Sequence, residues 1–205
     1  MLSKKICILD YGSGNVGSVC NILQHLGYKT KISNSKKDII DSTHLILPGV
    51  GAFSSAMKKI NEKIPIDTLE NEVFKGKPFL GICVGMQVLA EEGHEFNLNN
   101  GLGWIKGKVI KFDTSKVKVP HVGWNDLKII KETKLFKNHK DILDFYFVHS
   151  YFFELTDHSN LIAECDYGNY FPSVINRDNI FGVQFHPEKS QLAGQLLLKN
   201  FVEEL

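Results

Sequence analysis

The first half of the chain alternates short apolar runs with segments of helical periodicity. Four short runs of apolar or alternating residues, each bounded by turn residues, predict strands at 6–9, 28–32, 45–47 and 78–82. Apolar residues at helical spacing predict helices over 16–26, after Ala52, over about 67–74 and after Cys83. This alternation is typical of a parallel sheet with helices on both of its faces.

The second half of the chain has a different pattern. Residues 101–124 contain glycines and short alternating runs such as 108–112, which predict short, partly antiparallel strands. Further strands are predicted at 145–149, 161–165, 173–175 and 180–185. A closing amphipathic helix is predicted to bury Leu192, Leu196, Leu197 and Phe201. Without an internal repeat or long linker, we expect one α/β domain over 1–205, with a central, mostly parallel sheet and a smaller, partly antiparallel one.

Composition narrows the choice of partners. Hydrophobic residues make up 43% and charged residues 23%, and the formal net charge is +1. This balance gives no reason to expect nucleic acid or a membrane as partner. No apolar run approaches the roughly 18 residues of a membrane span, and the first residues lack the features of a signal peptide, so we expect a cytoplasmic protein. The four cysteines match no zinc pattern, and we expect neither a metal nor a cofactor.

Residues 12–17 fit the pattern G-x-G-x-x-G between a predicted strand and a predicted helix. A dinucleotide site needs this context together with an acidic residue at the end of the next strand. That strand ends at 32–35, ISNS, without an Asp or Glu. The motif therefore favours a tight turn with close packing of helix on sheet, which glycine permits because it lacks Cβ.

Residues 81–87, GICVGMQ, carry the strongest chemical signal. A strand leads into Gly81-x-Cys83-x-Gly85 and a helix follows, which is the arrangement of a nucleophile elbow with Cys in place of Ser. At a helix N-terminus the thiolate is favoured by the helix dipole and by free N–H groups. The N–H of Val84 can face an oxyanion that forms when Cys83 attacks a carbonyl.

A nucleophilic thiol needs a base and a group that orients the base. His186 comes after an apolar run, where open α/β sheets build their sites, and Glu188 is placed to hydrogen-bond the distal ring nitrogen. Residues 48–51, PGVG, follow another strand, so the backbone at Val50 and Gly51 is placed to supply a second N–H to the oxyanion. Separately, each segment also fits an ordinary loop or strand end.

These three segments, in this order, resemble the class I (triad) glutamine amidotransferases. The matching stretches are 48–51 (PGVG), 81–87 (GICVGMQ) and 185–188 (FHPE), and the resemblance covers essentially the whole chain. It implies the flavodoxin-like fold of that family and hydrolysis of L-glutamine by Cys83, with His186 as base and Glu188 as its orienting group. It further implies that Gln87, Ser150 and Tyr151 contact the bound glutamine.

Within the family, residues 10–15 (DYGSGN), 120–125 (PHVGWN) and 146–151 (YFVHSY) resemble a glutaminase subunit of histidine biosynthesis. The resemblance implies a heterodimer with a (β/α)8 cyclase subunit that consumes the ammonia. Residues at or near that interface would be Asn15, Trp124, Tyr146 and Lys189. The alternatives are a paralogous glutaminase that feeds a sugar-amidating synthase, a non-catalytic binding module, and a cysteine peptidase on a similar scaffold.

Overall fold

An eight-stranded sheet forms the centre of the computed structural model, which describes residues 4–140 and 142–205. Five neighbouring strands are parallel, in the spatial order β2 (Lys29–Ser33), β1 (Lys5–Leu9), β3 (His44–Gly49), β4 (Phe79–Cys83) and β14 (Ile180–Val183). The sheet continues through three antiparallel strands, β13 (Tyr170–Arg177), β12 (Leu161–Asp166) and β9 (Lys128–Ile129). The carboxyl ends of β3, β4 and β14 therefore lie side by side, where an open α/β sheet places its site.

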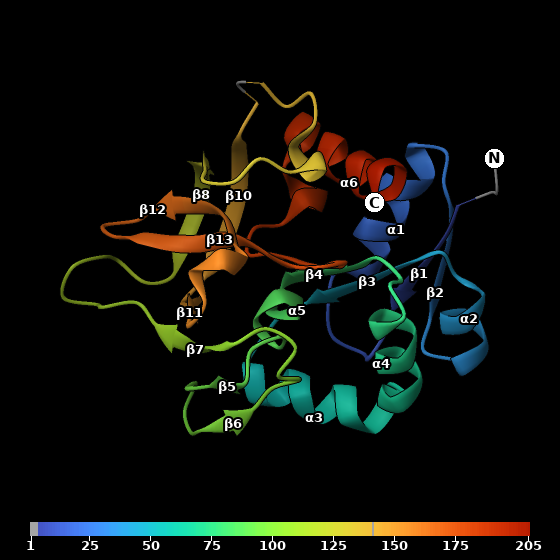
Figure 1. Cartoon of the computed structure of the whole chain (residues 1–205). Coiled ribbons are helices and arrows are strands. Elements are labelled where there is room, and N and C mark those ends of the chain that lie inside the picture. Colours follow the sequence, from blue (N-terminus) through green and yellow to red (C-terminus); the bar gives the residue numbers. More distant parts are fainter. Residues whose placement is uncertain (1–3, 141) are drawn as a thin grey trace.

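Helices cover both faces of the parallel part of this sheet (Figure 1). α1 (Val16–His25) and α6 (Gln191–Glu204) lie together on one face. α3 (Phe53–Lys63) and α4 (Ile66–Phe74) lie on the other, and α2 (Lys36–Asp41) packs against α4. Short helices complete the set: α5 (Val84–Gln87) and the single 3₁₀ turns η1 (Lys134–Phe136), η2 (His158–Asn160) and η3 (Pro187–Lys189).

Two smaller sheets lie beside the large one. β8 (His121–Asp126) and β10 (Asp144–His149) form an antiparallel pair. The other sheet has the order β11 (Tyr151–Leu155), β7 (Gly107–Lys111), β5 (Glu92–Gly93) and β6 (Asn99–Asn100). In it β7 pairs antiparallel with β11 and parallel with β5, so the expected mixed character of this region is confirmed.

The predicted strand at 45–47 is too short, because β3 continues through Pro48 to Gly49. Proline is tolerated there because β1 pairs with β3 only as far as Ile46, so no neighbouring strand on that side needs the missing N–H. The extension carries the segment 48–51 directly to the carboxyl end of β4.

The predicted buried face of the last helix is also partly wrong. Leu192 is 58% exposed and Leu196 is only partly buried, whereas Ala193 and Leu198 join Leu197 and Phe201 in the core. Gly194 explains the rotation, because a Cβ on this residue would collide with the carbonyl oxygen of Pro187 in η3. This close approach turns the first turn of α6 inward at 193–194.

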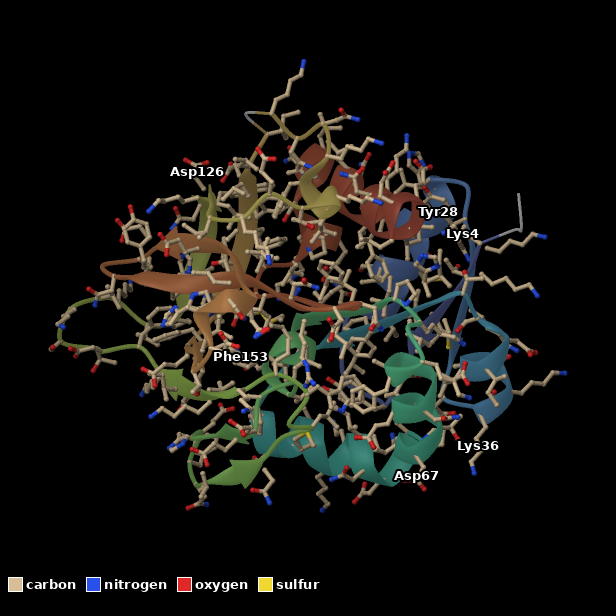
Figure 2. All side chains as sticks on the ribbon, in the orientation of Figure 1. Lys4, Tyr28, Lys36, Asp67, Asp126 and Phe153 are labelled. Carbon is tan, nitrogen blue, oxygen red and sulfur yellow. The ribbon has the colours of Figure 1, made fainter. Side chains whose placement is uncertain are left out.

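The parallel strands are buried along nearly their whole length except at the edge strand β2. Aromatic rings extend this core toward the smaller sheets, and the rings of Phe145 and Phe185 stack with centroids 4.0 Å apart. Charged side chains such as Lys36 and Asp67 lie on the outside (Figure 2). In the described parts of the chain, no helix has both the length and the apolar character that crossing a membrane requires.

Four buried histidines make the stability of this fold depend on pH. Burial lowers the pKa of His44 and His121 to about 4 and that of His149 to about 3, and it also lowers the pKa of His139. Below pH 6.5 the unfolded chain binds protons at these residues and the folded chain does not, so the free energy of unfolding falls as the pH falls toward 4. Each histidine contributes up to about 1.4 kcal/mol per pH unit.

Urea unfolding at pH 7, 6 and 5 measures this trend. His186 acts in the opposite direction above pH 6.5, because its pKa is raised, so the decrease from pH 6 to pH 5 measures the four buried histidines most directly. A free energy of unfolding that stays constant from pH 7 to pH 5 would contradict neutral burial of the four imidazoles.

Candidate active site

Cys83 lies at the point where β4 ends and α5 begins, in a backbone conformation that non-glycine residues rarely adopt. Its φ is 56° and its ψ is −112°. The turn is held from the neighbouring strand, since a Cβ on Gly85 would collide with the carbonyl oxygen of Leu47 in β3. A Cβ on Gly81 would likewise collide with the carbonyl of Gly85. Close backbone packing thus imposes a strained φ on the nucleophile candidate, as a nucleophile elbow requires.

The helix predicted after Cys83 is present and short. α5 spans four residues, 84–87, so it supplies one turn of N–H groups in place of a long helix dipole. The backbone N–H of Val84 is at the first position of that turn, where it has no partner within the helix. Stabilisation of negative charge at Cys83 therefore depends on local donors more than on the helix as a whole.

His186 and Glu188 form a buried hydrogen-bonded pair. Nδ1 of His186 lies 2.8 Å from Oε1 of Glu188, so the hydrogen bond expected from their spacing is present. Both side chains are almost completely shielded from solvent. The backbone N–H of His186 donates to the carbonyl of Tyr146 at 2.9 Å, which anchors the turn that carries the pair. Glu188 thereby fixes the ring so that Nε2 is the free nitrogen.

Opposing effects act on the His186 imidazole. Burial alone lowers the pKa of His186, but its interactions with Cys83 and Glu188 outweigh burial and raise the pKa to about 10. Nε2 is buried and has no hydrogen-bond partner within residues 4–140 and 142–205. A positively charged imidazole between a carboxylate and a thiolate is the state expected of a Cys–His–Glu triad.

A cavity of about 280 Å³ opens at this edge of the sheet. Of the residues singled out from the sequence, eight line it: Val50, Gly51, Cys83, Val84, Gln87, Ser150, Tyr151 and His186. Glu188 does not line the cavity but lies behind His186. Three chain segments that are far apart in the sequence, 48–51, 81–87 and 185–188, thus meet at one site.

Sequence reasoning missed three residues near the thiol. Glu95 brings a carboxylate to the cavity, and its Oε2 accepts a 2.6 Å hydrogen bond from the N–H of Phe53. His149 also lines the cavity. Gln184 is completely buried and its Nε2 lies 3.7 Å from Sγ of Cys83. The only signal for Gln184 was its place two residues before His186, which puts both side chains on the same side of an extended segment.

Trp124, Tyr146 and Lys189 form one cluster on the outer face of β8 and β10 and on η3. Trp124 is 44% exposed, and the centres of its ring and of the Tyr146 ring lie 6.1 Å apart in an edge-to-face arrangement. Nζ of Lys189 lies 5.6 Å from the centre of the Tyr146 ring. Asn15 lies elsewhere, with its Nδ2 donating to Oε1 of Glu188 at 3.3 Å. The four residues expected near an interface are therefore divided between an exposed aromatic cluster and the carboxylate of Glu188.

The glycine motif at 12–17 contacts the candidate site through protein groups. A Cβ on Gly14 would lie 2.6 Å from the carbonyl oxygen of Pro48, so this loop packs directly on the end of β3. The hydroxyl of Ser13 donates to the carbonyl of Val50 at 2.8 Å. Gly17 has open space beside its Cα, so the expected close packing occurs at Gly14 and not at the third glycine. Within the described residues, no cluster of three or more acidic, histidine or cysteine side chains is arranged to hold a metal ion.

The sequence model of the class I glutamine amidotransferases matches residues 7–205. This chain belongs to that family. The imidazole glycerol phosphate synthase subunit HisH of Leptospira interrogans is 45% identical over 201 residues, covering 96% of this amidotransferase and 98% of the relative. The protein of the same name from Methanosarcina barkeri is 47% identical over 203 residues, covering 98% of both chains.

Solved structures support the amidotransferase fold. The structure of PurLQS from Thermotoga maritima superposes with a TM-score of 0.74 at 18% identity, over 99% of both chains. A crystal structure of a glutamine amidotransferase superposes with a TM-score of 0.73 at 20% identity, over 97% of both chains. At these identities the likeness concerns the fold, and it confirms the predicted α/β architecture.

The elbow of this amidotransferase depends on the missing side chain at Gly85. We expect Gly85→Ala to lower the free energy of unfolding by more than about 2 kcal/mol, because the new methyl group collides with backbone that cannot move aside. Gly17→Ala is the matched control, since it adds the same methyl group to α1 in open space and should gain about 0.5–1 kcal/mol. Urea unfolding of both variants checks this, and equal effects would show that the elbow is not tightly packed.

Proposed function

We propose that this amidotransferase is the glutaminase subunit of an imidazole glycerol phosphate synthase, in which it hydrolyses L-glutamine and delivers the ammonia to a partner subunit. The observation that carries the proposal is the cavity lined by a strained cysteine and by His186, whose ring is held from behind by buried Glu188. The HisH relatives from Leptospira and Methanosarcina, similar over nearly their whole length, support the choice of synthase. A non-catalytic module would have no need for this arrangement.

In the first step the Cys83 thiolate attacks the carbonyl carbon of the glutamine side-chain amide. An S–C bond forms, and the carbonyl electron pair moves to oxygen. The imidazolium of His186 then gives its Nε2 proton to the amide nitrogen, the C–N bond breaks, and ammonia leaves. Glu188 stabilises the imidazolium before this transfer and orients the neutral ring after it.

In the second step water hydrolyses the glutamyl thioester. Neutral His186 takes a proton from the water through Nε2 while the water oxygen attacks the thioester carbon. The S–C bond breaks, glutamate is released, and the thiolate and imidazolium are restored. Each turnover thus consumes one glutamine and one water and yields one glutamate and one ammonia.

The residues that line the cavity have complementary roles in the proposal. The N–H of Val84, with backbone N–H groups at Val50 and Gly51, stabilises the oxyanion. Gln87, Ser150 and Tyr151 hold the substrate in the cavity, which is small and of the size that a free amino acid needs. Glu95 adds a carboxylate that suits the α-ammonium group of glutamine.

The proposed partner is a (β/α)8 cyclase barrel that forms a heterodimer with this chain. The exposed cluster of Trp124, Tyr146 and Lys189 supports an interface on this side, because Trp and Tyr are enriched in protein contacts. Asn15 lies next to the triad carboxylate, so a partner that contacts Asn15 would also influence Glu188. Neither curated relative favours the alternative of a paralogue for sugar amidation, because both carry the name HisH.

Replacing the nucleophile separates the two halves of the proposed reaction. We expect Cys83→Ala in complex with the cyclase to abolish synthesis of imidazole glycerol phosphate from glutamine and to leave synthesis from added ammonium salt intact. The reason is that the substitution removes the source of ammonia without touching the partner's chemistry. Product formation with each nitrogen donor measures both activities.

Cys165→Ala is the control, because Cys165 is a fully buried free cysteine on β12 and should be dispensable for both activities. If Cys83→Ala loses both activities and Cys165→Ala loses neither, Cys83 is structural. Retained synthesis from glutamine would mean that another group is the nucleophile.

A further inference from the structure

The backbone carbonyl of Tyr151 accepts two hydrogen bonds from side chains near the thiol. Nδ1 of His149 lies 2.8 Å from this oxygen, and Nε2 of Gln87 lies 2.9 Å from it. A backbone carbonyl can only accept hydrogen bonds. Both nitrogens therefore donate a hydrogen bond to this oxygen. The contact fixes Nδ1 as the protonated nitrogen of His149, and it fixes which end of the Gln87 amide carries the NH₂ group.

One branch of hydrogen bonds leads from Tyr151 to the nucleophile. Nε2 of Gln87 also donates to Oε1 of Gln184 at 3.0 Å. Because Gln184 uses its oxygen there, it presents its NH₂ group to Sγ of Cys83, 3.7 Å away. Gln87 and Gln184 are buried, so neither amide exchanges these partners for water. An N–H that faces sulfur stabilises the thiolate over the neutral thiol.

The other branch leads away from the site into β8. With Nδ1 donating to Tyr151, Nε2 of neutral His149 must accept, and it takes a 3.0 Å hydrogen bond from Nδ1 of His121. Nε2 of His121 is then the acceptor for Nδ2 of Asn125 at 3.5 Å. Burial lowers the pKa of His149 to about 3 and that of His121 to about 4, which keeps both rings neutral. Each ring therefore donates through Nδ1 and accepts at Nε2.

Packing holds the second ring of this chain in place. The His121 ring stacks between the rings of Tyr167 and Phe147, with centroid distances of 4.0 Å and 4.8 Å. His121 therefore cannot turn away from His149 without breaking both stacking contacts. Glutamine hydrolysis by Cys83 and His186 uses neither His121 nor His149, although His149 lines the same cavity as Cys83.

We propose that His149, held by His121, is a positioning residue for the nucleophile: it fixes the Tyr151 carbonyl, and through it the amides of Gln87 and Gln184, so that an N–H faces the Cys83 sulfur. His149 touches neither the substrate carbonyl nor the leaving nitrogen in this role. The inference deepens the proposed glutaminase function and depends on it only for the identity of the substrate. The hydrogen bonds orient the Gln184 NH₂ group toward the Cys83 thiol whatever the substrate is.

Alkylation of Cys83 by iodoacetamide tests the positioning role on the full chain, without glutamine. The rate at neutral pH is followed by mass spectrometry of the peptide that contains Cys83. We expect His149→Leu to slow alkylation by about tenfold, because the thiolate loses a fixed donor. His149→Asn places an NH₂ group near the position of Nδ1 and should restore most of the rate.

Two further variants test whether losing any buried histidine slows alkylation and whether the N–H that faces sulfur is needed. His139→Leu removes another buried histidine, one that bonds the carbonyl of Ala193, and it should leave the alkylation rate unchanged. Gln184→Glu keeps an acceptor for Gln87 but turns an oxygen toward sulfur, and it should slow alkylation at least as much as His149→Leu. This variant carries the test if His149→Leu does not fold.

Wild-type alkylation rates in His149→Leu or in Gln184→Glu would overturn the proposal. Equal slowing in folded His149→Leu and His149→Asn would also overturn it, since His149 would then serve only to fill space. In the complex with the cyclase, His149→Leu should lower kcat for glutamine hydrolysis and leave synthesis from ammonium unchanged. If the complex shows no glutaminase activity even in the wild type, the proposed function fails while the alkylation result still decides the role of His149.

Discussion

The site depends on how closely the backbones of β3, β4 and α5 approach one another at Cys83. Gly85 lies against the carbonyl of Leu47, and a Cβ on Gly49 would lie 2.6 Å from the backbone nitrogen of Gly85. These contacts leave no room for a relaxed turn, so Cys83 keeps its positive φ and lines the cavity. The same contacts place the end of β3 beside the thiol, where the proposed oxyanion donors are needed.

Burial acts in opposite ways on the histidines around this turn because their partners differ. His186 lies between a carboxylate and a thiol, and its pKa rises in spite of burial. Among the residues that the structure describes, His149 and His121 bond only to neutral groups, so burial lowers the pKa of each. One imidazole is therefore suited to move a proton, whereas the other two are suited to hold a fixed direction of hydrogen bonds.

Sequence reasoning found what local patterns determine. The parallel strands, the elbow at Cys83 and the hydrogen bond between His186 and Glu188 all follow from short motifs at the ends of apolar runs. The short strands β5, β6 and β9 and the strand β11 were not assigned, because their pairing depends on distant segments more than on their own composition. Gln184 and Glu95 were not predicted as site residues for the same reason. Only tertiary structure shows that Gln184 contacts the thiol and that Glu95 lines its cavity.

In the proposed reaction Cys83 forms a covalent bond with the glutamyl group. The most direct measurement uses a glutamine analogue with a diazoketone in place of the side-chain amide, added to the complex and followed by peptide mapping. The account predicts one analogue per chain, attached to Cys83, and protection from labelling by excess glutamine. Label on a different residue, or labelling of Cys83 that glutamine does not slow, would contradict the account.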